Sequence, residues 1–452
     1  MGRFEKIYDR SPIFFQNVMV SVKGYLNNRE RYGKAYTEYR AFLRDYDTWT
    51  YERKLAHQQE ELVSFVRFAY ENSTFYHEFY KDVDMASIQT AEDLKKLPIL
   101  EKEVLRQRID DVMIQTDEPC WKPSTGGTTG KSLQVTMTYS DMMRRMAILD
   151  HFKAKVGFEH RKMRRATFNG KHIVPPEQTK KKFWRYNASC KQKIYSSFHI
   201  TEENMRYYVE DLNRFKPQAL DGFFTSMCDI AGYIERHNIA LTFRPIAIFP
   251  TSETLTDEGR ALLERVFGCK VYNQYASSEG APFVNDCPEQ HLHVLLASGV
   301  IETYDDTDEV LVTSFTTHAT PLIRYRIGDR MVFDGDADCP CGDSSPLVRS
   351  IEGRSRDYLY TGDGMRLSHF GSILKGLPAV VIHMQLVQER REEVLLLLQV
   401  DTALFTAEHE RRIRENFTHA FGKNTGLTIR YVDEIPREPS GKYRMIKNLI
   451  EE

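Results

Sequence analysis

The sequence predicts an α/β protein with a large N-terminal α/β domain, which begins with a helical segment, and a small C-terminal α/β domain. The chain has 452 residues, more than one hydrophobic core usually organises, so two or more domains are expected. From about 120 to 350, short β-rich apolar runs alternate with helical patterns, which is typical of an α/β core. Beyond about 355 a second, shorter α/β pattern begins.

Residues 1 to about 100 are expected to be largely helical. In the segment 60–70, apolar residues recur at the spacing of one helix face. The segment 11–20, Ser-Pro-Ile-Phe-Phe-Gln-Asn-Val-Met-Val, is more apolar. It either packs against the domain body, which is the expectation, or rests on a membrane surface.

The central region predicts strands and helices in alternation. The run 245–250 predicts a buried strand, and 254–267 predicts a helix that ends near Gly268. The runs 270–275 and 309–315 predict two further strands.

The C-terminal region predicts a separate small unit. It contains a strand at 393–400, a helix at 407–421 and a strand at 427–432. The expected domains are therefore 1–354 and 355–452.

Composition excludes several classes of protein. The formal charge is −2, with acidic and basic residues interleaved, so nucleic acid is not an expected partner. The longest apolar runs, such as 394–398, are too short to span a bilayer, and because the segment 1–6 is charged, a signal peptide is not expected. Seven cysteines, an odd number, fit a reducing compartment better than a disulfide framework, so a cytoplasmic location is expected.

A loop rich in glycine and threonine carries the strongest chemical signal. It consists of Ser124, Thr125, Gly126, Gly127, Thr128, Thr129, Gly130, Lys131 and Ser132. Glycines let backbone amides turn inward, hydroxyls add donors and the lysine adds a positive charge, so the loop is suited to a polyphosphate. It is not a Walker A loop, because that motif requires glycine where Thr125 stands, and the preceding segment 118–123 is expected to be irregular. Taken alone, the loop is equally explained as a surface turn.

Four more segments bear on this loop. Tyr275-Ala276-Ser277-Ser278-Glu279 ends a predicted strand, where open α/β sheets bind ligands, and its glutamate is suited to hold Mg²⁺ against phosphate oxygens. Asp329, which closes Tyr-Arg-Ile-Gly-Asp, is expected in a turn, where it suits ribose hydroxyls. Arg354 lies at the predicted domain junction, and Lys442 follows a glycine turn near the C-terminus.

Taken in order, these five motifs resemble those of the adenylate-forming enzymes, which include acyl- and aryl-CoA ligases. The resemblance covers about 120 to the end of the chain. Cys339-Pro340-Cys341-Gly342, before Ile351-Glu352-Gly353-Arg354-Ser355, is similar to a hallmark of the branch of phenylacetate-CoA ligases and coenzyme F390 synthetases. Within that branch, Leu26 and the segments 16–21, 168–171 and 195–199 resemble the CapK-type proteins found with capsule and exopolysaccharide biosynthesis.

The resemblance implies an AMP-forming ligase that uses ATP and Mg²⁺. A carboxylic acid attacks the α-phosphorus of ATP, giving acyl-AMP and pyrophosphate. The mobile C-terminal domain then rotates, and a nucleophile captures the acyl group. Coenzyme A is the default acceptor, and an amino sugar or a carrier protein is the first alternative. The remaining candidate functions are transfer of AMP to a deazaflavin hydroxyl and a non-catalytic nucleotide-binding scaffold in polysaccharide assembly.

The resemblance also implies roles for single residues. Thr125 to Lys131 contact the β- and γ-phosphates, Glu279 binds Mg²⁺, and Asp329 holds the ribose hydroxyls. Lys442 bridges the acid and the α-phosphate during adenylation.

Other residues complete the implied site. Arg354 lies near ribose or phosphate, and Ser252, which follows a predicted strand, joins the nucleotide-binding set together with Ser124. Tyr275, Ala276 and Ser277 line the adenine and acyl sites.

Two features of the implied site stay open. The position two after the motif arginine is the family hinge, commonly aspartate or lysine, and here it is Arg356, so domain rotation is inferred only. The acid is not named by the sequence. Its pocket candidates are Phe168, Tyr195, His199, Phe223 and Phe224, and core packing explains these aromatic residues equally well.

A structural zinc site is the last expectation. Cys287 and His293 precede Cys339 and Cys341 by about 50 residues, and three sulfurs with one imidazole suit a closed tetrahedral Zn²⁺ site. His293 is preferred over His291. Some members of the resembling branch carry such a zinc ion, and ordinary thiols and histidines near a turn are the alternative.

Overall fold

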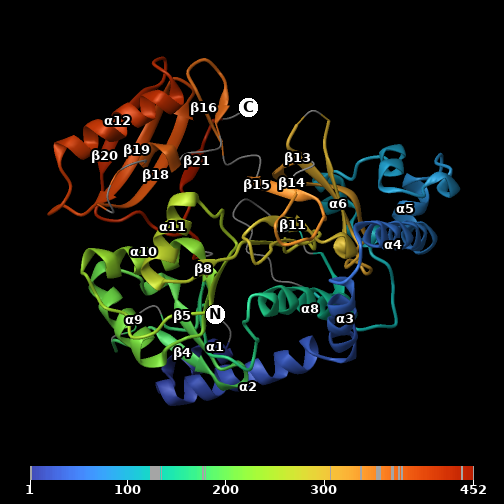
Figure 1. Cartoon of the computed structure of the whole chain (residues 1–452), viewed down its shortest axis with the longest axis horizontal. Helices are drawn as coiled ribbons and strands as arrows, with labels where there is room; N and C mark the ends of the chain where they lie inside the picture. Colours follow the sequence, from blue (N-terminus) through green and yellow to red (C-terminus); the bar gives the residue numbers. More distant parts are fainter. Residues whose placement is uncertain are drawn as a thin grey trace. The chain divides into compact units, whose positions relative to one another are not determined.

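The computed structural model describes residues 3–122, 133, 135–175, 178, 180–305, 307–335, 338–352, 358–367, 371–374, 377, 380–438 and 441–450. Its backbone contacts form two compact units, and Figure 1 shows the elements of both. Unit 1 comprises Met1–Met163, Tyr186–Gln192 and Tyr272–Ile351, and unit 2 comprises Arg164–Arg185, Lys193–Val271 and Glu352–Glu452. The secondary structure is mixed α/β, which confirms the predicted fold class.

The first part of unit 1 is helical. Its elements are α1 (Arg3–Arg10), α2 (Ile13–Arg31), α3 (Lys34–Tyr46), α4 (Tyr51–Asn72), α5 (Thr74–Phe79), η1 (Met85–Ser87), η2 (Ala91–Lys96), α6 (Lys102–Gln107), α7 (Ile109–Val112) and, after β2 (Met137–Thr138), α8 (Tyr139–Lys155). The predicted helix at 60–70 is the C-terminal half of α4, which begins where Thr50 accepts a hydrogen bond from the Arg53 amide. Among the described residues, no helix combines the length and apolarity needed to cross a membrane.

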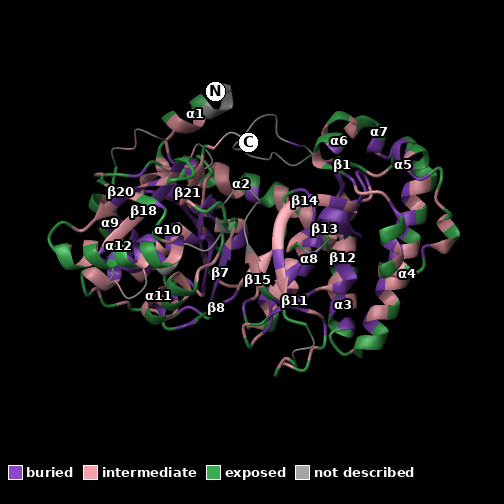
Figure 2. Ribbon diagram, turned by 90° about the horizontal axis from the view of Figure 1, so that it is seen from above, coloured by how far each residue is buried: buried purple, intermediate pink, exposed green. Residues whose placement is uncertain are grey.

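An antiparallel sheet forms the other layer of unit 1. Its strands are β9 (Gln274–Tyr275), β10 (Val284–Asp286), β11 (Leu292–Val294), β12 (Gly299–Thr303), β13 (Glu309–Ser314), β14 (Leu322–Phe333) and β15 (Leu347–Glu352), in the order β12-β13-β14-β15-β11-β10-β9. Figure 2 shows buried residues along β13, in which every residue after Glu309 is buried. One side of α4 carries apolar residues at helical spacing, namely Leu62, Phe65, Val66 and Ala69. These side chains pack in one hydrophobic core with apolar side chains of the sheet.

Unit 2 contains a six-stranded sheet flanked by helices. Its strands are β3 (Arg165–Asn169), β4 (Trp184–Asn187), β5 (Gln192–Ser196), β6 (Ala219–Phe223), β7 (Ala247–Thr251) and β8 (Lys270–Val271), in the order β4-β5-β3-β6-β7-β8. The helical elements are α9 (Glu202–Phe215), α10 (Phe224–Arg236), α11 (Asp257–Phe267) and η4 (Ser197–His199), whereas η3 (Ala188–Cys190) belongs to unit 1. Strands β3, β6, β7 and β8 run parallel, so their carboxyl ends share one edge. The strand at 245–250 and the helix at 254–267 are confirmed as β7 and α11.

The C-terminal part of unit 2 has its own sheet and core. The elements are β16 (Leu359–Tyr360), β17 (Arg366–Leu367), η6 (Gly371–Leu374), β18 (Val381–Arg390), β19 (Glu393–Val400), α12 (Ala407–Phe421), β20 (Gly426–Tyr431) and β21 (Ile446–Asn448). The four strands order as β20-β19-β18-β21, and α12 lies along this sheet (Figure 1). Val394, Leu396 and Leu398 alternate into a core with Ile413 and Phe417 of α12. The predicted strand and helix are confirmed with the same ends as β19 and α12.

Two local predictions are wrong, and a third is confirmed only in part. The single strand expected at 270–275 is two strands in different sheets, because Val271 pairs with Ile248 while Tyr275 pairs with Val284. The irregular segment expected at 118–123 contains β1 (Cys120–Trp121), which pairs with β2 (Met137–Thr138). The segment 11–20 lies largely in α2, which packs on η3 and α8 as expected, but Phe14, Phe15 and Val18 of this segment are exposed.

Candidate functional site

The segment that follows β9 in unit 1 carries a buried carboxylate. Glu279 is 7% exposed, and it accepts a hydrogen bond from the Ser278 hydroxyl at 3.0 Å. The Lys102 ammonium lies 3.4 Å from its other carboxylate oxygen. A buried carboxylate is suited to a divalent metal ion, because oxygen ligands are what Mg²⁺ prefers.

Asp329 lies near this segment, but in a strand and not in the expected turn. It belongs to β14, at a bulge where Gly328 has φ +85°, between the pairs Leu311–Arg326 and Glu309–Arg330. The bulge bends the strand at this position. The Tyr275 hydroxyl donates a hydrogen bond to the Asp329 carboxylate at 2.7 Å. Burial, with the Asp329 carboxylate, holds the pKa of Tyr275 well above its usual value, so Tyr275 is a donor at neutral pH.

A buried arginine that the sequence reasoning missed holds the Tyr275–Glu279 segment. Arg145 of α8 donates to the carbonyls of Gly280 and Ala281 and to the Thr316 hydroxyl, each at 2.9 Å. It also donates to the Ser277 carbonyl at 3.4 Å. Burial lowers the pKa of Arg145 to about 10, so the guanidinium is still charged at neutral pH.

Ser277 closes a local turn in the Tyr275–Glu279 segment. The Ser277 hydroxyl accepts hydrogen bonds from the amides of Gly280 and Ala281 at 3.1 and 2.9 Å, so this side chain closes a local turn. Ala276 is exposed. Tyr275 of this segment therefore reaches Asp329, and Glu279 reaches the Lys102 ammonium.

Most of the predicted phosphate-binding residues lie outside the described residues. These are Ser124, Thr125, Gly126, Gly127, Thr128, Thr129, Gly130, Lys131 and Ser132 of the glycine loop, and Arg354. The hinge position Arg356 also lies outside the described residues. The strands on either side of this loop are described, and β1 pairs with β2. Met137 of β2 lies beside Gly280, where a Cβ would be 2.9 Å from the methionine methyl group, so β2 is next to the Glu279 segment.

In unit 2, Lys442 follows a turn at the carboxyl ends of the parallel strands. The Gly441 amide donates to the Glu438 carbonyl at 2.8 Å, and Gly441 has φ +79°. A Cβ at Gly441 would lie 2.8 Å from the Gly170 Cα and 3.1 Å from the Phe198 ring, so only glycine fits this approach. Gly170 directly follows β3, and the Lys442 turn therefore lies where open α/β sheets bind ligands.

The ends of β6 and β7 lie at the same edge. After β7, Ser252 has φ +67°, a conformation that non-glycine residues adopt at a cost and that clusters at functional sites. Glu253 accepts hydrogen bonds from the Thr225 amide at 2.8 Å and from the Tyr443 amide at 3.4 Å. Burial raises the pKa of Glu253. The residues that flank Lys442 are thus tied to the segments after both strands.

A buried ion-pair network fixes the C-terminal part of unit 2 to α10. His383 of β18 lies 2.7 Å from Asp229 through Nε2, and Arg437 pairs with the second carboxylate oxygen. His383 also stacks on Tyr443, at 4.9 Å between ring centres. Burial lowers the pKa of His383, but Asp229 outweighs burial and holds it above its usual value. Burial likewise raises the pKa of Asp229, and the cations outweigh it, so the carboxyl titrates below its usual range.

This network predicts a pH dependence of stability. Because the folded-state pKa of His383 is raised, its contribution is complete below the unfolded value, about pH 6.5, and is lost as the pH rises through the folded value. The Asp229 contribution is present above about pH 4 and is lost as the pH falls through its lowered folded value. We expect the melting temperature to fall between pH 6.5 and pH 8.5 by more in the wild type than in His383→Gln. Thermal unfolding at several pH values measures this, and His419→Gln, on the exposed side of α12, is the matched control. Parallel profiles for His383→Gln and wild type would contradict the assignment.

The aromatic candidates for an acyl pocket lie in the core of unit 2. Phe168 and Tyr195 are fully buried and stack at 5.1 Å, and Phe224 belongs to the same core. The Tyr195 hydroxyl donates to Asp211 at 2.8 Å. His199 stacks on Phe183, at 5.3 Å between ring centres. Phe223 is 7% exposed at the end of β6. Core packing accounts for Phe168, Tyr195 and Phe224.

The structure brings the four residues of the predicted zinc site together in unit 1. The ligand atoms of Cys287, His293, Cys339 and Cys341 all lie within 4.8 Å of one another. Cys287 Sγ is 3.7 Å from Cys339 Sγ, and Cys341 Sγ is 3.5 Å from His293 Nε2. Three thiols and one imidazole in this arrangement fit a tetrahedral structural Zn²⁺ site without an open position.

Residues around this cluster orient its members. His293 Nδ1 lies 3.2 Å from the Ser345 carbonyl, an acceptor that fixes the proton on Nδ1 and leaves Nε2 for a metal ion. The Asp343 amide donates to Cys341 Sγ at 3.4 Å, and the Asp343 carboxylate pairs with Lys54 at 3.0 Å. Burial raises the pKa of Asp343, but the Ser345 amide and Lys54 outweigh burial and hold it at about 2. His291 is exposed, although its Nδ1 lies 3.1 Å from Cys339 Sγ.

We expect the purified protein to contain about one zinc ion per chain. Cys341→Ser and His293→Ala should lose the metal and melt at a lower temperature, whereas His291→Ala is the matched control and should keep it. Elemental analysis and thermal unfolding with and without a chelator measure both effects. Protein without zinc whose unfolding is unchanged by the chelator would rule the site out.

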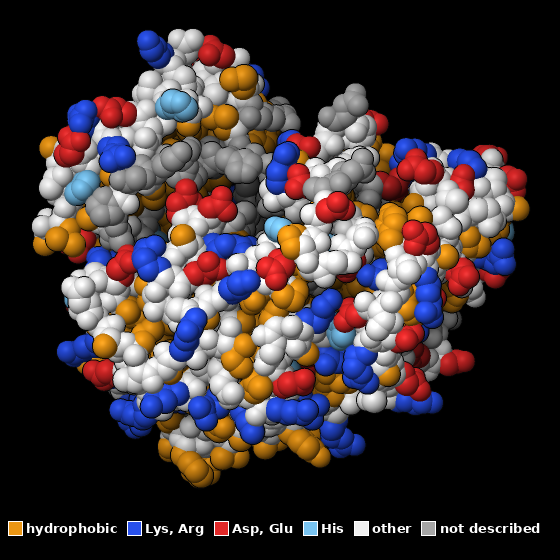
Figure 3. All heavy atoms as spheres, viewed as in Figure 1, with side chains coloured by type: hydrophobic (Ala, Val, Ile, Leu, Met, Phe, Trp, Pro, Cys, Tyr) orange, Lys and Arg blue, Asp and Glu red, His pale blue; other side chains and the backbone are white. Residues whose placement is uncertain are grey.

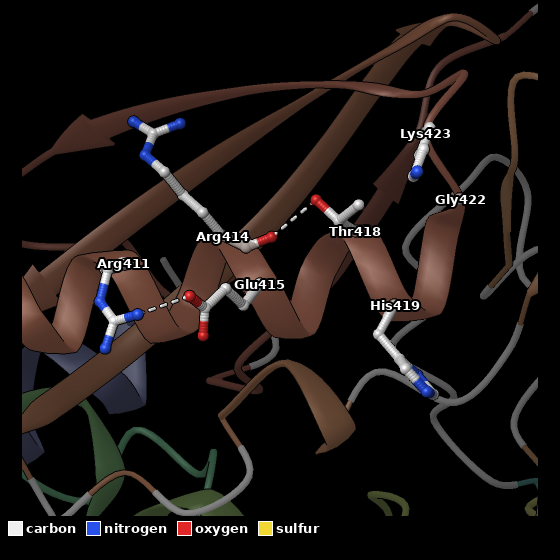
Figure 4. A pocket seen from close by; sticks show the side chains of 7 residues that line it. All are labelled: Arg411, Arg414, Glu415, Thr418, His419, Gly422 and Lys423. Carbon is white, nitrogen blue, oxygen red and sulfur yellow. Dashed lines mark hydrogen bonds and ion pairs between the residues drawn. The ribbon is translucent and has the colours of Figure 1, made fainter.

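A depression on α12 lies apart from the predicted site residues. Figure 4 shows the side chains that line it, which are Arg411, Arg414, Glu415, Thr418, His419, Gly422 and Lys423. Arg411 pairs with Glu415 at 2.8 Å across one turn of the helix. Such i,i+4 pairs are common on solvated helix faces, and no function is assigned to the depression.

Two solved structures share this fold. The first is 2-hydroxyisobutyryl-CoA ligase in the postadenylation state with R3-HIB-AMP, with a TM-score of 0.69 and 15% identity over 86% of this chain and 88% of that chain. The second is the anthranilate CoA ligase AuaEII with anthranoyl-AMP, with a TM-score of 0.50 and 14% identity over 71% of this chain and 64% of that chain. The chain therefore has the fold of the adenylate-forming CoA ligases.

The family follows from sequence comparison. Protein CapK of Staphylococcus aureus is 35% identical over 450 residues, which cover 98% of this chain and 99% of that protein. Residues 359–449 match the family described as CapK C-terminal domain. The chain belongs to the CapK family, as its motifs suggested.

Proposed function

We propose that this protein activates a carboxylic acid with ATP and Mg²⁺, releases pyrophosphate and passes the acyl group of the acyl-AMP to an acceptor. The observation that carries the proposal is the Lys442 turn at the carboxyl ends of β3, β6 and β7. A catalytic lysine of an acid-activating enzyme has to be presented at a ligand-binding edge, and this edge is one. The shared fold and the CapK family membership support the same reaction.

The proposed roles follow from the charges that the reaction brings together. A carboxylate and a triphosphate repel each other, and the Lys442 ammonium neutralises charge where the carboxylate oxygen meets the α-phosphorus. Glu279 would hold Mg²⁺, which screens the phosphate oxygens when bound. Asp329, oriented by the Tyr275 hydroxyl, would accept hydrogen bonds from the ribose. Thr125 to Lys131 would bind the β- and γ-phosphates.

The C-terminal domain is proposed to begin at residue 355 and to move between the two half-reactions. Support comes from the family match over 359–449 and from the separate core that β18, β19 and α12 form. The Asp229–His383 pair would then hold one of the two arrangements.

The acceptor is proposed to be coenzyme A, with an amino sugar or a carrier protein as the alternative that CapK family membership supports. The two differ in the nucleophile, a thiol or an amine, that attacks the acyl carbon. Turnover that persists without coenzyme A in the presence of an amino sugar would select the alternative.

The first test is pyrophosphate release from ATP and Mg²⁺ across a panel of aryl, fatty, hydroxy and amino acids. Hydroxylamine traps the acyl-adenylate as a hydroxamate, so the natural acceptor is not needed. We expect release that depends on one class of acid and yields the matching hydroxamate. If the protein binds ATP but releases no pyrophosphate with any acid of the panel, the non-catalytic scaffold would be favoured.

A further inference from the structure

Helix α2 turns its polar side toward unit 1. The Asn17 and Ser21 side chains accept hydrogen bonds from the backbone amides of Tyr186 and Ala188, at 2.9 and 3.0 Å. Gly24 is buried so closely that a Cβ would lie 2.4 Å from the nearest side-chain atom. The helix is thus fixed by polar contacts and by one glycine, without burying its large apolar side chains.

The opposite side of α2 is apolar and exposed. Its exposed residues are Phe14 (71%), Phe15 (54%), Val18 (44%), Val22 (53%), Tyr25 (59%) and Leu26 (51%), and we call them the apolar stripe. The spacings of three and four residues place them on one side of the helix. Among the described residues, 14 large hydrophobic side chains are exposed, and these six with Ile7 make half of them. Such clustering marks an interaction surface, whereas scattered exposed residues do not.

Basic side chains border the apolar stripe. Residues 6 to 31 include five Lys or Arg residues and two Asp or Glu residues, so this segment is basic, although the whole chain has a formal charge of −2. Lys23 and Arg29 are exposed on α2 itself. Lys191 is exposed next to η3, which packs on α2, and the Arg161 guanidinium lies 4.7 Å from the Tyr32 ring at the end of α2. In Figure 3 a hydrophobic patch lies at the lower edge, where Figure 1 draws α2, with Lys and Arg side chains beside it.

We propose that α2 docks this protein on an anionic lipid surface, with the apolar stripe at the boundary of headgroups and acyl chains. An apolar stripe bordered by Lys and Arg matches this partner, because lipid phosphates attract the cations and the acyl chains bury the stripe. A second copy of the chain is a poorer match, since a two-fold contact through α2 would bring the same basic side chains together. The helix would lie in the plane of the surface.

The test is cosedimentation of the full-length protein with vesicles. Phosphatidylcholine vesicles and vesicles that also contain phosphatidylglycerol are compared at low and high salt. We expect binding to the anionic vesicles that weakens with salt. Val22→Asp should lower the partition coefficient by about 10-fold or more, the loss expected when an apolar side chain no longer enters lipid. Lys23→Glu should lower it by roughly 10-fold or more, because the charge near the surface changes by two units.

Leu404→Asp is the matched control, since Leu404 is 49% exposed and lies outside α2. It should bind as the wild type does. Circular dichroism of all variants should be unchanged, because the substituted side chains are exposed. Equal binding of Val22→Asp and wild type, or no vesicle binding by wild type, would overturn the proposal. A wild-type dimer that Val22→Asp converts to monomer without any vesicle binding would overturn it in favour of contact between copies.

Discussion

Replacing Lys442 by alanine is expected to slow acyl-AMP formation by about 10²- to 10³-fold, the usual loss when one preorganised group at a developing charge is removed. Lys442 follows the Gly441 turn at the edge where β3, β6 and β7 end, and the turn is held by Phe198 and Glu253 contacts that do not involve the lysine side chain. The substitution should therefore leave the fold intact. Pyrophosphate release and hydroxamate formation measure the loss.

The same variant separates the two half-reactions. Supplied with acyl-AMP and the acceptor, Lys442→Ala should still transfer the acyl group, because the lysine is assigned to adenylation alone. Lys423→Ala, an exposed lysine of the same C-terminal region, is the matched control and should be fully active. Equal loss of both half-reactions in Lys442→Ala would contradict this division of roles.

Arg145→Ala should destabilise the protein by about 3 kcal/mol or more, among the largest effects expected from one substitution. The change leaves the buried carbonyls of Gly280 and Ala281 and the Thr316 hydroxyl without their 2.9 Å donor, and it opens a cavity beside Phe283. Denaturant unfolding monitored by circular dichroism measures this loss.

Two further variants separate position from charge. Arg144→Ala is the matched control on the same helix, and because the Arg144 guanidinium lies 5.7 Å from the Tyr39 ring, we expect a change of about 1 kcal/mol or less. Arg145→Lys keeps the charge with fewer donors, so it should fold but form acyl-AMP more slowly, since the Glu279 segment is less well held. Wild-type stability and rate in Arg145→Lys would show that the carbonyl contacts do not position this segment.

The predictions from sequence succeeded where the signal was local. The strand 393–400 alternates buried residues at Val394, Leu396 and Leu398, and the helix 407–421 repeats at the helical period, so both were found with the correct ends. The four residues of the cysteine and histidine cluster were also chosen from spacing and resemblance, and the structure brings them within 4.8 Å. Thiols and imidazoles are few in the chain, so their pattern is visible.

The predictions failed where a contact is long-range. Nothing local marks Arg145 among the 62 Lys and Arg residues, because its partners lie more than 130 positions away in the chain. Leu100 forms a β-bridge to Tyr325 of β14, and this places Lys102 beside Glu279. No periodic pattern in the sequence predicts this bridge. The run 270–275 is uniformly strand-like, and the change of sheet at Tyr272 follows from pairing partners alone.

The apolar side of α2 shows a different limit. The sequence pattern identified an apolar helix, but not which side would be buried. The Asn17, Ser21 and Gly24 contacts decide that the polar side faces the protein. An amphipathic period does not distinguish a helix that covers a core from one that is presented to a partner.

Transfer of oxygen from the acid to AMP tests the central claim most directly. The acid found with the panel is prepared with ¹⁸O in its carboxylate and incubated with the enzyme, ATP, Mg²⁺ and hydroxylamine, and the AMP is analysed by mass spectrometry. If the carboxylate oxygen attacks the α-phosphorus, the later break of the acyl carbon–oxygen bond leaves that oxygen on AMP, so AMP carries one ¹⁸O. AMP without ¹⁸O, formed alongside hydroxamate, would contradict activation through acyl-AMP.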